Sequence, residues 1–263
     1  MKHKPTTRRL LTTSLLLALL ALVSITAATA AWMTIADRTR VRSMRMEITS
    51  GANLRFDLDP HESFEQYVKT LSFREIAQRI ARDKGFDPKD NPLTPVTTRD
   101  CVHFTLEDGS EAKKEYYLEF TLHFMATEDM VVHLTSAGGD GTRIESPTAA
   151  LPKAMRLSFT AEQTSIYDPG LGDTTSQSAA GRTFGLPEGG AMTYHDGNAL
   201  FSLKAGVDKP VVMRVWLEGT DEACTDALRG ADYSIRLRFI GTDENGNLLE
   251  DPRASRQKQE KGR

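Results

Sequence analysis

Alternation of apolar and polar residues with a period of two dominates the chain beyond its first forty residues. The clearest case is EYYLEFTLHFM, residues 115–125, in which every second residue is apolar. Strict alternation of this length is typical of a half-buried strand in an antiparallel sheet. Shorter segments of the same kind lie at 43–48, 53–59, 101–107, 130–134, 155–159, 200–203, 211–217 and 233–240. Short strands joined by Gly, Asp and Asn turns predict a mostly β chain, an antiparallel β-sandwich or jelly roll.

The segment 101–107, CVHFTLE, is followed by Asp108-Gly109, which is a common hairpin turn. We therefore expect 101–107 to form a hairpin with 115–125 and to bury Val102, Phe104 and Leu106. Further along, residues 166–192 are polar and rich in glycine, and we expect a long loop there. Loops of such length are functional or disordered.

Residues 60–85 break the β pattern and predict a helical insertion of two short helices. The first would begin after the N-cap and proline of Asp59-Pro60. The second would begin at the capping box formed by Ser72 and Glu75 and end at Gly85. The simplest expectation is that this insertion covers one end of the sandwich, because amphipathic helices mostly bury one face on their own core.

The N-terminus has the pattern of an export signal. Four basic residues and no acid lie in MKHKPTTRR, and the next charged residue after Arg9 is Asp37. A basic start, an apolar run and terminal small residues are typical of a signal peptide, with Ala30 and Ala31 as candidate cleavage positions. The alternative is an uncleaved hydrophobic helix that anchors the chain in the membrane. Either way the bulk of the chain is expected outside the cytoplasm.

These features give a domain plan. Residues 1–31 are a signal peptide or anchor, 32–40 a polar linker, 41–249 the β-sandwich, and 250–263 a charged tail expected to be disordered. The whole chain has 33 basic and 36 acidic residues, and loss of the leader with its four basic residues would leave the exported part more acidic. Such a domain does not bind nucleic acid by neutralising phosphates.

The chain has two cysteines, Cys101 and Cys224. An exported protein can keep a disulfide, so one long-range bridge between them is a candidate. The alternative is two buried free thiols.

The sequence predicts no catalytic residue, metal site or cofactor. Zincin, serine-hydrolase and cysteine-hydrolase motifs are absent. His103, His123 and His133 share the polar side of neighbouring strands, and a metal bound there is a weaker alternative to three solvent-facing histidines. Asp243-Glu244-Asn245-Gly246-Asn247 has oxygen ligands around a glycine, but a turn explains it equally. Trp216 beside Arg214 is a candidate ligand contact, with a buried Trp as the alternative.

The leader and the residues after it, AWMTIADRTRVRSMRMEITSGANLRFDL, resemble exported proteins of Gram-positive bacteria that are processed by the alternative, SipW-type signal peptidase, the camelysin/TasA-like group. The matching pieces are Thr29-Ala30-Ala31, Trp32, the polar stretch 37–42 and the strand that ends at Ile48. The resemblance implies a jelly roll, signal peptidase as a partner, and self-association through the N-terminal strand. No residue here matches a metal motif, so the protease activity ascribed to camelysin is not implied.

The sequence therefore predicts an exported, non-catalytic structural or interaction protein of the cell surface or of an extracellular biofilm matrix. The second hypothesis is a binding module for a glycan or a protein, which would use residues 166–192 or the Trp216 face. A metal-dependent hydrolase is the third and weakest hypothesis.

Overall fold

The computed structural model describes residues 16–19, 21, 43–188, 191–228 and 230–249. The predicted cleavage positions Ala30 and Ala31, the linker 32–40 and the tail 250–263 lie outside these residues. The chain divides into two units, 1–38 and 39–263, which are described separately. In the first, residues 16–19 and 21 are helical. Among the described residues, no helix is both long and apolar enough to cross a membrane.

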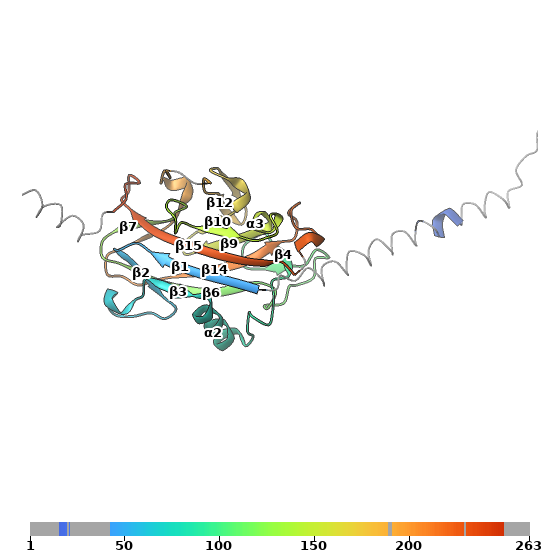
Figure 1. Ribbon diagram of the computed structural model, residues 1–263, viewed down its shortest axis with the longest axis horizontal. Helices are drawn as coiled ribbons and strands as arrows, with labels where there is room; N and C mark the ends of the chain where they lie inside the picture. The colour runs from blue at the N-terminus through green and yellow to red at the C-terminus, as the bar shows by residue number, and fades with distance from the viewer. Residues whose placement is uncertain (1–15, 20, 22–42, 189–190, 229, 250–263) are drawn as a thin grey trace, which may run out of the picture. The chain divides into compact units, whose positions relative to one another are not determined.

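The second unit is mostly β and forms the predicted sandwich from two sheets (Figure 1). The first sheet has the order β13 (Ala199–Leu203), β7 (Met130–Leu134), β15 (Asp232–Thr242), β1 (Ser43–Ser50) and β3 (Thr70–Ser72), and β8 (Arg143–Glu145) also pairs with β15. The second sheet has the order β11 (Thr175–Ser178), β12 (Gly181–Phe184), β10 (Thr164–Tyr167), β9 (Met155–Thr160), β14 (Lys209–Glu218), β4 (Pro95–Thr98) and β5 (Phe104–Thr105). In addition, β6 (Leu118–Ala126) pairs with β14 and with β2 (Leu54–Asp57).

The core lies between the sheets and is made by the inward residues of each strand. Phe239 of β15 packs edge-on against Phe56, Phe124 and Phe159 of the opposite sheet, with ring centroids 6.1, 5.2 and 5.8 Å away. All four rings are fully buried. Edge-to-face aromatic pairs add to the free energy gained by burial, so this cluster ties the two sheets together.

The strands are not all antiparallel, which corrects the sequence expectation. Three neighbouring pairs are parallel: β1 with β15, β10 with β12, and β14 with β4. β1 lies between β15 and β3, and it pairs with β15 along its whole length. Met46 and Ile48 are buried and Glu47 is exposed, so burial of the apolar face holds this strand in its own domain.

The first predicted helix of the insertion is wrong. The 3₁₀ turn η1 (Phe64–Gln66) takes its place, and β3 follows. Val68 is extended and pairs with Phe56 of β2. The Arg55 guanidinium also donates to the backbone carbonyls of Phe64 and Tyr67. These tertiary bonds replace the helical ones that the capping pattern favoured.

The second predicted helix is confirmed as α2 (Phe73–Lys84), which lies beside β3 and β6 in Figure 1. The Glu75 carboxylate accepts from the backbone N–H and the hydroxyl of Ser72, both at 2.7 Å. Gly85 ends the helix with φ of 79°, and its N–H donates to the carbonyl of Ala81. Positive φ favours glycine at this position.

We expect Glu75→Ala to lower the free energy of unfolding by about 1 kcal/mol, because two donors at the start of α2 lose their acceptor. Urea denaturation of the two proteins measures this. Arg74→Ala, at the neighbouring exposed position, is the control, and equal effects of both changes would contradict the assigned cap.

The predicted hairpin of 101–107 with 115–125 is also wrong. β6 pairs with β14 and β2, and only the two residues of β5 are extended, against β4. The Asp100 carboxylate accepts from the N–H groups of Val102 and His103, both at 2.8 Å, and this local turn competes with a strand. Cys101 consequently has φ of 57°, and Val102 is 51% exposed instead of buried.

The segment 166–192 is not a structureless loop in its described part. It begins in β10, continues through the 3₁₀ turn η2 (Pro169–Leu171), and forms the hairpin of β11 and β12. This hairpin extends the second sheet beside β10. The short helix α3 (Ala150–Ala154) precedes β9.

Candidate functional site

The outer face of the second sheet carries a row of polar and aromatic side chains across β14, β9 and β10. Trp216 lies opposite Arg156 in the register of β14 and β9. Asp168 directly follows β10 and forms an ion pair with Arg156, at 3.0 Å. The alternate residues Val215 and Leu217 enter the core between the sheets. The same period of two therefore builds the core on one face and this row on the other.

The β11–β12 hairpin and the end of β4 border this row and leave a recess of about 260 Å³, which we call the outer groove. Its apolar lining comes from Ile166, Leu171, Ala180 and Trp216. Its polar lining comes from Thr98, Arg156, Asp168, Ser176, Ser178, Thr183 and Glu218. Most of these residues belong to strands of one sheet, and rigid strands position side chains more precisely than loops.

Arg156 is held tightly inside the groove wall. Its two terminal nitrogens donate to three acceptors, namely the carbonyls of Lys153 and Met155 and the carboxylate of Asp221, and the guanidinium also forms an ion pair with Asp168. The three charged side chains are each at most 20% exposed. The guanidinium of Arg156 therefore interacts with both carboxylates and with backbone carbonyls of the same chain.

The two carboxylates that line the groove are fixed in place. Glu218 accepts from Trp216 Nε1 at 3.0 Å and from the Thr220 hydroxyl at 2.7 Å. Asp168 accepts from the N–H of Gly170 at 2.7 Å and forms an ion pair with Arg156. Burial raises the pKa of Asp168, and the charges of Asp221 and Glu218 act in the same direction, while Arg156 opposes them. Hydrogen bonds therefore fix the orientation of both carboxylates, and the two groups lie close enough for their negative charges to repel each other.

Trp216 and Arg214 are not the exposed ligand contacts that the sequence suggested. Trp216 is 1% exposed and packs with Val96, Cys101, Phe104 and Ile166, so it forms the floor of the groove. Arg214 is buried, and its Nε donates to Glu119 at 2.7 Å. Residues of β4, β5 and the turn between them pack on Trp216, which confirms the alternative of a buried Trp.

The candidate disulfide between Cys101 and Cys224 is not formed, and both cysteines are free. Cys101 packs in the cluster around Trp216, whereas Cys224 packs against the main core between the sheets. Membership of separate clusters keeps the two thiols apart. Burial raises the pKa of each thiol to about 11, which suppresses the reactive thiolate at neutral pH.

We expect two free thiols in the unfolded protein and slow alkylation in the folded one. Cys224 is half-buried and reacts before Cys101, which is fully buried. Mass spectrometry after timed alkylation, without reductant, measures both rates. Failure to alkylate either cysteine in denaturant would show a bridge and contradict the structure.

The three histidines proposed as a metal site are separated. Each ring nitrogen Nδ1 lies against its own partner: His103 against Asp100 at 2.7 Å, His123 against Asp208 at 2.9 Å, and His133 against the side chain of Asn198 at 2.9 Å. Within the described ranges, no three His, Cys, Asp or Glu side chains are grouped to hold a metal ion. The weak metal hypothesis therefore has no support from the geometry.

The candidate calcium loop is a turn closed by its own residues. The Asp243 carboxylate accepts from the N–H of Asn245, and from the N–H and the side-chain amide of Asn247. Gly246 has φ of 80°, as this turn requires. These bonds use the oxygens that a cation would need.

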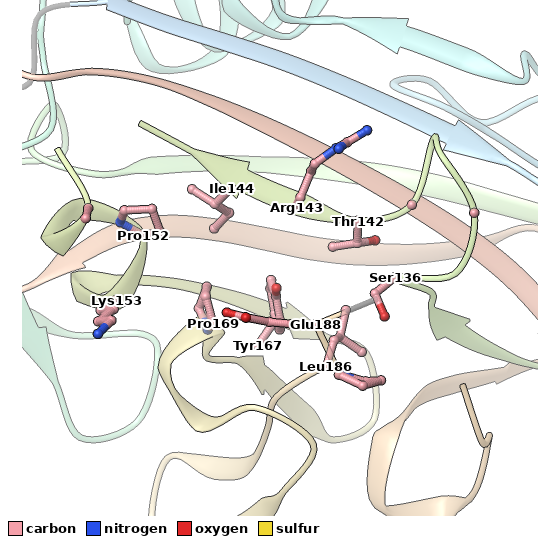
Figure 2. Close-up of a pocket in the computed structure, with 14 residues that line it drawn as sticks. Ser136, Thr142, Arg143, Ile144, Pro152, Lys153, Tyr167, Pro169, Leu186 and Glu188 are labelled. Atoms are coloured by element: carbon pink, nitrogen blue, oxygen red, sulfur yellow. The ribbon is translucent and has the colours of Figure 1, made fainter. Parts of the chain in front are cut away.

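A second recess, of about 430 Å³, lies beside β8 and α3 (Figure 2). Figure 2 shows Ile144 on one side of it and Tyr167, Pro169 and Leu186 on the other, with Arg143 pointing away. Its lining also includes Lys153 and Glu188. This recess has no pair of carboxylates fixed by hydrogen bonds, so the outer groove is the better defined candidate site.

Comparison of the chain with protein-family models, with curated proteins and with solved structures finds no match. The leader and the chemistry of the outer groove are therefore the features that bear on function.

Proposed function

We propose that this chain is an exported, non-catalytic interaction protein of the cell surface or extracellular matrix, and that the outer groove is its ligand site. The observation that supports this most strongly is the combination of a rigid sheet floor, a hairpin wall and two pre-oriented carboxylates in one recess. Concave sites with a few fixed polar groups are typical of ligand recognition. The basic, then apolar leader supports the extracellular location.

A pair of carboxylates in a groove is also typical of the active site of a glycoside hydrolase. In such an enzyme one carboxyl must hold a proton and the other must be free to attack or to activate water. Here Asp168 faces the Arg156 guanidinium, and Glu218 accepts from Trp216 and Thr220. Both carboxylates are thus already engaged by groups of the chain itself, and neither is left free to attack a sugar carbon, so binding fits the groove better than hydrolysis.

N-terminal sequencing of the full-length product, recovered from the medium and from the membrane fraction of producing cells, tests the proposed location. We expect either a new N-terminus next to Ala30 or Ala31, or an intact chain whose sandwich is digested by protease added to whole cells. A chain that keeps Met1 and resists protease until the cells are lysed would contradict the proposal.

A further inference from the structure

We infer that the outer groove binds a basic side chain of a protein partner, an ammonium or guanidinium group carried on an apolar stem. The inference rests on the proposed function only in taking the groove as an interaction site. It is carried by the charge balance of the groove, by the interactions of Arg156, and by the size of the recess.

The charge balance favours a cation. Asp168 and Glu218 line the groove, and Asp221 pairs with Arg156 in its wall, so three carboxylates lie here beside one guanidinium. The three acids lie close enough that Asp221 and Glu218 both disfavour the charge on Asp168. A ligand with a positive group relieves this repulsion, and its hydrogen bonds to carboxylates are stronger than those of a neutral group.

An anionic ligand has no free cation to bind. Arg156 is the one basic residue among the described lining residues, and its terminal nitrogens already donate to carbonyls and carboxylates of the chain. Breaking these bonds to reach an anion would leave Asp168 and Asp221 unpaired, which is costly for groups so little exposed.

The shape and the walls favour one long side chain. The volume of about 260 Å³ lies below the range of roughly 300–1,000 Å³ that is usual for drug-sized ligands. Ile166, Leu171 and Ala180 offer apolar contact for a methylene stem. Around them, the hydroxyls of Ser176, Ser178 and Thr183 can accept from the remaining N–H groups of the ligand head.

A saccharide fits this groove less well. The glycan hypothesis drew on an outward Trp216 whose ring would stack on a sugar. The structure leaves that ring 1% exposed under Val96, Cys101 and Phe104, so the ring face is not available. The groove has hydrogen-bond acceptors that a sugar could use, but Trp216 offers no exposed ring face on which a sugar could stack.

Calorimetric titration of the full-length chain with N-acetyl-arginine amide tests the inference, with N-acetyl-citrulline amide as a neutral probe of nearly equal shape. We expect the arginine probe to bind at least tenfold more tightly than the citrulline probe, because a hydrogen bond from a charged donor to a carboxylate is roughly twice as strong as one between neutral groups. Glu218→Gln should weaken arginine binding at least tenfold, and Glu145→Gln, on β8, should not change it. N-acetyl-lysine amide should also bind.

Equal binding of arginine and citrulline probes, preference for N-acetylglucosamine, or no binding of either basic probe would overturn the inference. Thermal unfolding of Glu218→Gln checks that the variant is folded. The comparison of the arginine and citrulline probes uses the unchanged chain and does not depend on the variant. If the basic probes fail while the protein is found outside the cell, the proposed function survives and this ligand class does not. A protein confined to the cytoplasm would instead defeat the proposed function.

Discussion

Replacing Trp216 with alanine should lower the free energy of unfolding by about 3–5 kcal/mol, the usual cost of removing a fully buried aromatic side chain. Trp216 is 1% exposed and packs edge-on against Phe104, with ring centroids 5.4 Å apart. Its Nε1 also donates to Glu218, so the change removes both packing and a hydrogen bond. Chemical denaturation followed by circular dichroism measures the difference.

Val102→Ala is the control for this change. Val102 belongs to the same covering segment but is 51% exposed, so its loss should alter stability by less than about 0.5 kcal/mol. Comparable effects of the two substitutions would show that Trp216 is not enclosed by β4 and β5.

Arg156→Met should destabilise the protein by about 3 kcal/mol at neutral pH, because removing one partner of a buried ion pair leaves uncompensated charge. The side chains of Asp168 and Asp221 are 11% and 20% exposed, and both lose the same guanidinium. Arg99→Met, at the exposed position directly after β4, is the matched control and should be nearly neutral.

The cost of Arg156→Met should also depend on pH. Burial already raises the pKa of Asp168 in the folded protein, and loss of Arg156 removes the group that opposes this. A carboxyl whose folded pKa exceeds its unfolded value binds its proton more readily when folded, so the variant loses stability as pH rises through that interval. The difference from the unchanged protein should therefore shrink as pH falls from neutral toward about 4. A difference that stays constant would contradict unpaired carboxylates as the cause.

The strands with a clean alternation were predictable because buried apolar and exposed polar residues alternate along a half-buried strand. β6, β14 and β15 lie where the pattern placed them, and α2 begins and ends at the predicted cap and glycine. The failures have local causes. The Asp100 turn took 101–103 out of a strand, and Arg55 together with the bridge to β2 replaced a helix. Such tertiary contacts leave no periodic signal.

The candidate site was predictable only in part. The sequence indicated the 166–192 segment and Trp216, and both line the outer groove. It did not single out Arg156, or Asp168 within that segment, and these two residues pair across the neighbouring strands β9 and β10. The polar parity of Arg156 in β9 was visible, but a polar residue on a half-exposed strand usually faces solvent. Only the register and the covering hairpin show that these residues are enclosed.

Site-specific photocrosslinking on intact cells tests the central claim that the outer groove is an extracellular interaction site. A photoreactive residue at Ser178, on the exposed hairpin that lines the groove, is compared with one at Ser202, an exposed position of β13 in the other sheet. The account predicts crosslinks to an extracellular partner from position 178 that are lost with Glu218→Gln, and none from position 202. Crosslinks that are equal at both positions, or that persist in Glu218→Gln, would contradict it.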